Sequence, residues 1–374
     1  MWALAIRNLA HDRVRLAITL TGVTFSVALI LIQVGMFFGM TANSSTVIEH
    51  SEGDLWIMAR NSQNFDMVNP FPESLVTAAR SVAGVEWAEN LIQQFAFMRL
   101  ANGGTEQIEI IGFDLNAKVG RPWNVKQGDW NALRGTDGIF VDETSFSRLG
   151  TVRVGEFREI VEKKVRVVGI TNGIMSFTTA PYIFTSYESA QRMVPQQLAG
   201  KTTYIVVKVA AGHNLKKVKQ ELERRFKNYD VRTSREWAKK TRDYWTWQTG
   251  IGAGFFGNAL MGFIVGLVIV SQTIYSSTME HIREYGTLKA IGAKNLDVYS
   301  VILQQAGVAA AAGFLLAIVL QQIVMAIKPI TVQIAAPPAL YVSTFLVTTV
   351  MCGLAAIVSV RRVAKIDPAE VFKG

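Results

Sequence analysis

The sequence has few of the residues from which catalytic and metal sites are usually built. It contains one cysteine, Cys352, and four widely separated histidines, His11, His50, His213 and His281. A single cysteine cannot form an intramolecular disulfide, and these histidines do not follow a zinc-binding spacing. No G-x-S-x-G nucleophile motif is present. We therefore expect no catalytic residue, no metal site and no cofactor in this chain.

A complete phosphate-binding loop is also missing. Gly200-Lys201-Thr202 resembles the end of such a loop, but Pro195 stands where its first glycine is needed. Proline removes a backbone N–H donor and fixes φ, so the chain cannot curl around a phosphate there. The formal net charge of +9 comes with no helix-turn-helix, zinc-finger or RNA-binding signature. We expect neither a nucleotide nor a nucleic acid to bind.

Charged side chains are absent from long stretches of the second half of the chain. None occurs between Tyr244 and Met279 or between Val298 and Ile327, and half of all residues are hydrophobic. Each such stretch exceeds the roughly 20 residues that cross a bilayer. The sequence therefore predicts four transmembrane helices, at residues 16–41, 246–278, 298–327 and 340–360.

Basic residues near the span ends predict the orientation. They gather before the first span, between the second and third, and after the fourth. They are Arg7, Arg13, Arg15, Arg283, Lys289, Lys294, Arg361, Arg362, Lys365 and Lys373. Because such flanks stay in the cytoplasm, we predict a cytoplasmic entry helix (1–15), a cytoplasmic segment (279–297) and a cytoplasmic tail (361–374). Residues 42–245 and a short loop, 328–339, then lie outside.

The large outer region has the pattern of an α+β domain. A strand, a helix beginning near Pro72 and a second strand open it; a strand, a helix capped by Asn214 and a final strand close it. These two β-α-β units, within 50–105 and 201–240, predict one split sheet. Short strands between turns predict a β-rich insertion at 106–200, at the end of the domain far from the membrane. The predicted fold class is a membrane α-helical protein, one helix plus three, with a large extracytoplasmic α+β domain between helices 1 and 2.

Glycines crowd the start of the second span. Gly254, Gly257, Gly262 and Gly266 would allow another helix to approach closely. They serve either helix packing within one chain or a dimer interface between two copies, and the sequence leaves both open.

The segment 279–297 is too short to be a domain, so its use is to contact something else. Its apolar residues, from Met279 to Ile291, recur in steps of three, which drift by about 60° per step around an ideal helix. We therefore predict a helix interrupted near Gly286, with Gly292 as its C-terminal cap. The alternatives are a solvated loop and a helix that docks into a groove of a cytoplasmic protein.

Three motifs carry a resemblance to a known family. Arg283–Ala293 (REYGTLKAIGA) resembles the R-E-[IF]-G-x-x-[KR]-A-[IL]-G-A coupling segment of FtsX/MacB-type ABC permeases, with Tyr285 in place of the usual residue. Asp367–Val371 resembles the D-P-x-E-x-[LF] tail of that family, and Leu4–Leu9 resembles its entry helix. Within the family the chain is most similar to DevC-type permeases, which work with a membrane fusion protein.

The resemblance implies a permease subunit of a bacterial ABC exporter in the inner (plasma) membrane. Two copies would pair with a cytoplasmic ATPase dimer, which binds the ATP and Mg, and ATP-driven motion would pass through the spans to the outer domain. The implied coupling residues are Glu280, Ile282, Arg283, Glu284, Tyr285, Gly286, Leu288, Lys289 and Gly292. The exporter would expel a lipid, a peptide or a small hydrophobic substrate, with a periplasmic membrane fusion protein and an outer-membrane channel as partners. The alternative is an FtsX-like regulator that controls an extracytoplasmic cell-wall hydrolase.

Overall fold

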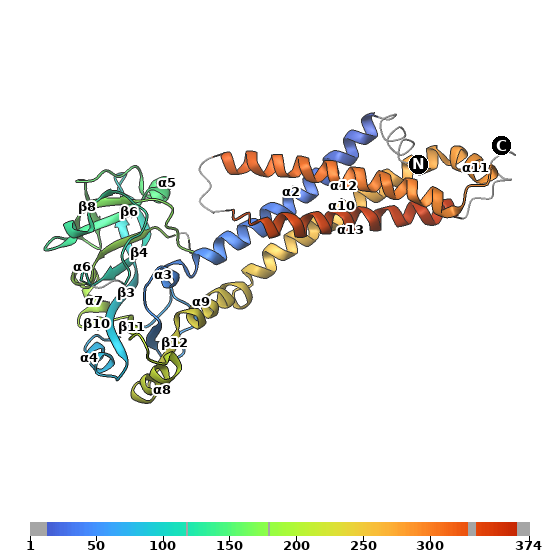
Figure 1. Ribbon diagram of the computed structural model, residues 1–374. Coiled ribbons are helices and arrows are strands. Elements are labelled where there is room, and N and C mark those ends of the chain that lie inside the picture. Colours follow the sequence, from blue (N-terminus) through green and yellow to red (C-terminus); the bar gives the residue numbers. More distant parts are fainter. Residues whose placement is uncertain (1–12, 117–118, 179, 328–333, 365–374) are drawn as a thin grey trace. The chain divides into compact units, whose positions relative to one another are not determined.

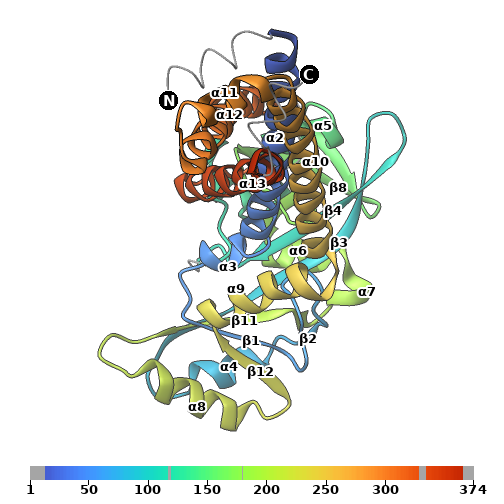
Figure 2. The same cartoon turned by 90° about the vertical axis from the view of Figure 1, so that its right-hand side faces the viewer.

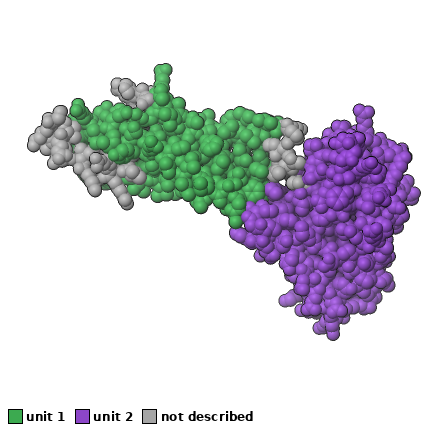
Figure 3. All heavy atoms as spheres, turned by 180° about the vertical axis from the view of Figure 1, so that it is seen from behind, with its two compact units in different colours: residues 1–38, 252–374 green, residues 39–251 purple. Residues whose placement is uncertain are grey.

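The structure of the protein is a computed structural model that describes residues 13–116, 119–178, 180–327 and 334–364. It separates into two compact units, which Figure 3 shows in different colours. The helical unit comprises residues 1–38 and 252–374, and the sheet domain comprises residues 39–251. The chain therefore leaves the helical unit, forms the sheet domain and returns.

Long apolar helices form the helical unit (Figure 1). They are α2 (Arg13–Asn43), α10 (Ile251–Glu280), α12 (Asn295–Ala326) and α13 (Pro338–Ala364), with the short α11 (Ile282–Ala290) between α10 and α12. Four of the described helices are long and apolar enough to cross a membrane, one near the N-terminus and three in the C-terminal part of the chain. The predicted arrangement of one membrane helix plus three is confirmed.

Small and branched side chains hold these helices together. The buried cluster includes Val23 and Val27 of α2, Ile274 of α10, Ala306 of α12 and Ala355 of α13. Gly313 of α12 approaches α2 so closely that a side chain at this position would overlap Val23. Close packing of this kind replaces the hydrophobic effect as the main force between helices in lipid.

A ten-stranded sheet forms the centre of the sheet domain, in the order β12-β1-β11-β3-β4-β9-β6-β8-β5, with β7 pairing β3 and β8. Its strands are β1 (Leu55–Ala59), β3 (Val85–Arg99), β4 (Thr105–Phe113), β5 (Val125–Gly128), β6 (Gly138–Asp142), β7 (Phe157–Ile160), β8 (Lys163–Thr171), β9 (Tyr182–Ser186), β11 (Tyr204–Val209) and β12 (Tyr229–Thr233). A separate two-stranded sheet joins β2 (Phe71–Pro72) to β10 (Lys201–Thr202).

Short helices cover the sheet. They are α3 (Thr46–Glu49), α4 (Leu75–Arg80), α5 (Phe146–Leu149), α6 (Tyr187–Met193), α7 (Pro195–Leu198), α8 (Leu215–Arg225) and α9 (Ser234–Asp243), with the 3-10 turns η1 (Trp130–Leu133) and η2 (Glu143–Ser145). A π-helix, η3 (Tyr244–Gln248), follows α9 and precedes α10 along the chain. The sheet domain therefore combines α and β structure, as the sequence predicts.

Two β-α-β units interleave at one end of the sheet. β1 and β3 are both antiparallel to β11, which lies between them, and β11 and β12 are both antiparallel to β1. The connecting helices α4 and α8 cover the same face, where they bury Val76 and Leu222 against Ile57 and Ile205 (Figure 2). Asn214 caps α8 by accepting hydrogen bonds from two backbone N–H groups, as its position in the sequence predicts.

The strands of the predicted β-rich insertion continue this same sheet. The reason is the length of β3, which has 15 residues. Its first half, Val85–Leu91, pairs with β11, whereas its second half, Leu91–Arg99, pairs with β4. One strand therefore belongs to both parts, and the base and the insertion share a continuous backbone ladder.

Candidate functional site

The segment between α10 and α12 forms the short helix α11 and a tight turn. α10 ends at Glu280 and α11 begins at Ile282, so the break falls at His281, where φ is −87° and ψ is 15°. Gly286 lies inside α11, and the predicted interruption near it is wrong. The physical reason is that the drift carries the apolar residues off the packed face without breaking the helix: Tyr285 is buried, Leu288 is partly buried and Ile291 is 80% exposed.

Gly292 ends α11 as predicted. Its φ of 106° is in the left-handed region, where glycine has no steric penalty. The Gly292 N–H donates to the Lys289 carbonyl and the Ala293 N–H donates to the Leu288 carbonyl, each at 3.0 Å. These are the two bonds of a Schellman motif. Two residues later the Lys294 N–H donates to Asp297 Oδ2 at 2.9 Å, which fixes the start of α12.

One face of α11 packs against the helical unit. Tyr285 is only 1% exposed and lies in the same buried cluster as Val298 and Ile302 of α12. Gly286 is also buried, and Leu288 is partly buried against that cluster. Among the predicted coupling residues, Tyr285 and Gly286 therefore hold the segment in place and offer no surface to a partner.

The opposite face of α11 and the turn after it are open. Arg283 and Glu284 are exposed, whereas Ile282 and Lys289 are half-buried. Two apolar residues project at the turn: Ile291 is 80% exposed and Leu296 is 73% exposed. The coupling motif does not include Leu296. The signal that could have revealed it is a lone apolar residue within the polar stretch that begins α12.

Local polar contacts order the exposed face. His281 Nδ1 lies 3.0 Å from Glu284 Oε1, and the Thr287 hydroxyl donates to the Arg283 carbonyl at 2.9 Å. Glu284 is therefore held at the N-terminal turn of α11, where the helix dipole favours a negative charge.

Glu280, the last residue of α10, forms an ion pair with α2. The Arg15 guanidinium donates two hydrogen bonds to its carboxylate, one of them from Nη1 to Oε2 at 2.6 Å. Bidentate pairs of this kind are stronger than single hydrogen bonds. Glu280 therefore connects the end of α10 to α2 at the base of the segment.

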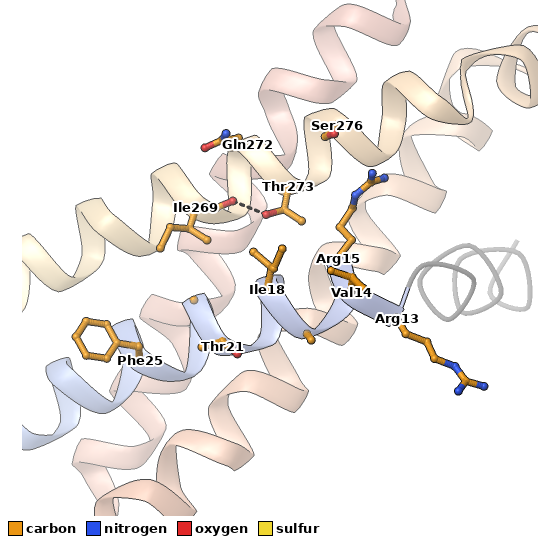
Figure 4. A pocket seen from close by; sticks show the side chains of 12 residues that line it. Arg13, Val14, Arg15, Ile18, Thr21, Phe25, Ile269, Gln272, Thr273 and Ser276 are labelled. Atoms are coloured by element: carbon orange, nitrogen blue, oxygen red, sulfur yellow. Dashed lines mark hydrogen bonds between the residues drawn. The ribbon is translucent and has the colours of Figure 1, made fainter.

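A groove of about 1050 Å³ runs between α2 and α10 near this pair. Figure 4 shows Arg15 directed towards α10 and Arg13 directed away from it. Ile18 and Phe25 of α2 and Gln272 of α10 also line the groove. The groove is mostly apolar, with polar side chains from both helices along its length.

The four predicted interface glycines divide into two pairs. Gly262 and Gly266 are buried against α2: a Cβ at Gly262 would lie 2.7 Å from a Leu29 methyl, and one at Gly266 would lie 2.8 Å from Ser26 Cβ. Gly254 and Gly257 have open space at the position of a Cβ. The first pair packs helices within the chain, and the second pair is available to another molecule.

Two motif matches and part of a loop fall outside the described residues: Leu4–Leu9, Asp367–Val371 and residues 328–333. Within the described residues, no group of three or more histidine, cysteine, aspartate or glutamate side chains could hold a metal ion.

Comparison with known proteins assigns the family. A MacB-like periplasmic core domain matches residues 16–225, and an FtsX-like permease C-terminal domain matches residues 257–368. The chain belongs to the FtsX/MacB-type family of ABC transporter permeases.

Relatives of similar length support this assignment. An uncharacterized ABC transporter permease of Methanocaldococcus jannaschii is 21% identical over 99% of this chain and 96% of its own length. One from Mycobacterium tuberculosis is 22% identical over 99% of each chain. Among solved structures, the periplasmic region of MacB from Actinobacillus actinomycetemcomitans is 12% identical with a TM-score of 0.38, and covers 50% of this chain and 91% of that one.

Proposed function

We propose that this permease transmits the motion of a separate ATPase dimer, which docks on the exposed face of α11 and the turn that follows it. The observation that carries the proposal is the division of α11 into two faces. Tyr285 fixes one face in the core of the helical unit, while Arg283, Glu284 and Ile291 are exposed on the other. Helices that dock into a groove present an apolar anchor with charges around it.

The segment is built to pass a displacement on to the membrane helices. The capped turn at Gly292 and the Lys294–Asp297 bond leave little freedom between α11 and α12. The Arg15–Glu280 pair adds α2 to the same connection. A displacement of Ile291 and Leu296 would therefore move α11, α12 and α2 together as a rigid body. Such a rigid-body movement is one of the usual switching transitions.

In this proposal the basic flanks keep α11 in the cytoplasm of a bacterial inner membrane, and the sheet domain lies outside. Two copies of the chain would pair, with Gly254 and Gly257 of α10 at their contact. The ATPase dimer would bind the ATP and Mg. A membrane fusion protein and an outer-membrane channel would accept a lipid, a peptide or a small hydrophobic substrate from the sheet domain.

The apolar residues Ile291 and Leu296, which we call the docking face, test the proposal when each is replaced by a charged residue. We expect Ile291→Asp and Leu296→Asp to weaken binding of the ATPase by about 30-fold, because an interface anchor contributes roughly 2 kcal/mol. The ATPase is identified by pull-down of the permease in a mild detergent, and its binding and stimulation are measured with both proteins in nanodiscs. The matched control is Leu215→Asp, an exposed leucine on α8 of the sheet domain.

Full binding and stimulation by both docking-face variants would contradict the proposal. A change of the same size in Leu215→Asp would show that the effect is not specific to the docking face. Cross-linking in intact cells then separates the two roles of the sheet domain. Recovery of a membrane fusion protein favours export, whereas recovery of a cell-wall hydrolase favours the FtsX-like regulator.

A further inference from the structure

Two carboxyl groups are buried side by side in the sheet domain. Asp66 lies in the loop after β1 and is 2% exposed, and Glu109 lies in the middle of β4 and is fully buried. On β4, Ile111 and Phe113 share the face of Glu109 and belong to the apolar core that also contains Phe65. Glu109 therefore occupies a position where the alternation of the strand calls for an apolar residue.

The hydrogen-bond donors that reach this pair are neutral. Trp245 Nε1–H donates to Asp66 Oδ2 at 3.0 Å. Gln93 Nε2–H donates to Glu109 Oε1, and the Ser176 hydroxyl contacts Glu109 Oε2, both at 2.9 Å. Asp66 Oδ1 is buried and accepts no hydrogen bond from a described donor, so the carboxyl of Glu109, which is close enough to share a proton with Asp66, is the partner left to it. A fully ionised pair would lack the positive charge that usually accompanies buried carboxylates.

The charges around the pair favour retention of a proton. Burial raises the pKa of Asp66 to about 6. Burial, and next the charge of Asp66, raise the pKa of Glu109 well above its usual value. The other titratable groups that face the pair are Tyr182 and Tyr204, and burial raises the pKa of both phenols, so they stay neutral. No described lysine, arginine or histidine contributes to either carboxyl shift.

The pair also connects elements that are distant in the sequence. Trp245 lies in the π-helix η3, directly before α10 along the chain. The ring of Phe177, next to Ser176, stacks on the Trp245 ring at a centroid distance of 4.2 Å. The carboxyl pair therefore holds both η3 and the loop around Ser176 against the sheet. π-Helices are rare and are frequent at functional positions.

We propose that Asp66 and Glu109 form a proton-binding site that clamps η3 to the sheet when it holds one proton and releases η3 when that proton leaves to solvent. Loss of the proton leaves two negative charges in a dry site with only neutral donors. Glu109 is fixed in a central strand, so the strain is relieved by movement of the Asp66 loop, together with Trp245. The pH on the side of the sheet domain thereby regulates the turn that leads into α10. This site does not depend on the proposed docking of an ATPase.

Hydrogen–deuterium exchange of the full chain in nanodiscs tests the clamp. Asp66 is ionised above its pKa of about 6, so the last proton of the pair is the one on Glu109. We expect the protection factor of residues 244–250, corrected for intrinsic exchange, to fall by about tenfold as the pH is raised from about 7 to about 10, the change produced by one unit of pKa difference. Glu109→Gln and Asp66→Asn each remove one of the two charges, so protection in both variants should change by less than about threefold over that range. Glu143→Gln, a half-exposed carboxylate that pairs with Lys126 in the same domain, should keep the response of the original protein.

An infrared measurement reads the proton itself. At about pH 8, where Asp66 is ionised because its pKa is about 6, the protein should show the absorption of a protonated buried carboxyl group, and Glu109→Gln should lack it. The proposal is overturned if this absorption is absent, or if the exchange of residues 244–250 responds to pH equally in both pair variants and the original. Protection of β4 and β11 shows that a variant is folded, and Asp66→Asn serves where Glu109→Gln does not fold. None of these readouts involves an ATPase.

Discussion

Asp142 of the sheet domain and Gln321 of the helical unit are both buried polar residues, but they differ in their hydrogen bonds. In the sheet domain, the buried carboxylate of Asp142 accepts hydrogen bonds from Thr144, Thr171, Gly173 and Ile174. In α12 of the helical unit, Gln321 is fully buried, and neither atom of its amide has a hydrogen-bond partner among the described residues.

The two units also differ in how far their apolar side chains are exposed. Leu260, Leu315 and Val350 of the helical unit are each more than half exposed, as suits a surface that faces lipid. The sheet domain keeps the side chains of β1, β6 and β9 almost entirely inside. The comparison teaches that the sheet domain is stabilised by a core closed off from its surroundings. The helical unit depends on close packing and on the bilayer around it.

The largest effect is expected for Tyr285→Ala. Removing a buried aromatic ring leaves a cavity and costs about 3–5 kcal/mol. We expect the helical unit to unfold at a markedly lower temperature while the sheet domain is unchanged, as measured by exchange of peptides from each unit. Tyr285→Phe retains the ring and is the control. Equal losses in both units would break the comparison, because the units would then not be stabilised independently.

The next effect concerns the pH dependence of the sheet domain. The pKa of Asp66 is about 6 in the folded protein against 3.8 for the unfolded chain. Because the folded value is raised, its contribution to stability is fully present below pH 3.8 and is lost as the pH rises through about 6. We expect a loss of about 2–3 kcal/mol over that window. Urea unfolding at several pH values measures it, and a flat profile in the original protein would contradict it.

Glycine replacements separate packing from self-association. Gly262→Leu should destabilise the helical unit by about 1–3 kcal/mol, because Leu29 and Ser26 leave no room for a larger side chain. A Cβ at Gly257 would have no described neighbour from elsewhere in the chain within 4 Å, so stability should not change in Gly257→Leu, whereas pairing of two copies should weaken. Thermal unfolding and single-molecule subunit counting in nanodiscs distinguish the two outcomes. A stability loss in Gly257→Leu would place that residue in the packing of one chain.

The smallest effect is expected at Gln321. Replacing an unpartnered buried amide by Gln321→Leu should leave stability unchanged or raise it by about 1 kcal/mol. Asp142→Leu should instead lower stability, because it would leave the buried donors that now bind the Asp142 carboxylate without an acceptor. Denaturation of the two variants in parallel measures this contrast. A clear loss in Gln321→Leu would mean that its amide has a partner in the membrane.

Much of the fold could be predicted because its signals are local. Charge-free stretches of more than about 20 residues define the spans, and short continuous apolar runs define β1 and β11. The cap at Gly292 and the cap at Asn214 were predictable for the same reason. Each depends on residues within a few positions of each other.

What could not be predicted depends on contacts between distant residues. The break at His281 is hidden because the apolar steps continue across it, and the inward direction of Tyr285 is decided by α12. Asp66, Glu109 and Trp245 are far apart in the sequence, and the residues around each of them form no recognisable motif. Their proximity results from the pairing of β4 with β3 and from the return of the chain along α9, for which one sequence carries no signal.

The double pairing of β3 has a consequence for the order in which the protein is made. β3 and β4 are joined by a short turn, so this hairpin can close as soon as residue 113 is available. β1 precedes them in the chain, yet its two neighbours, β11 and β12, end only at residues 209 and 233. Because contacts distant in sequence form slowly, the newly synthesised chain holds β1 unpaired until most of the domain has emerged. The strand made first is completed last, so protection of β1 during synthesis is a requirement for correct assembly.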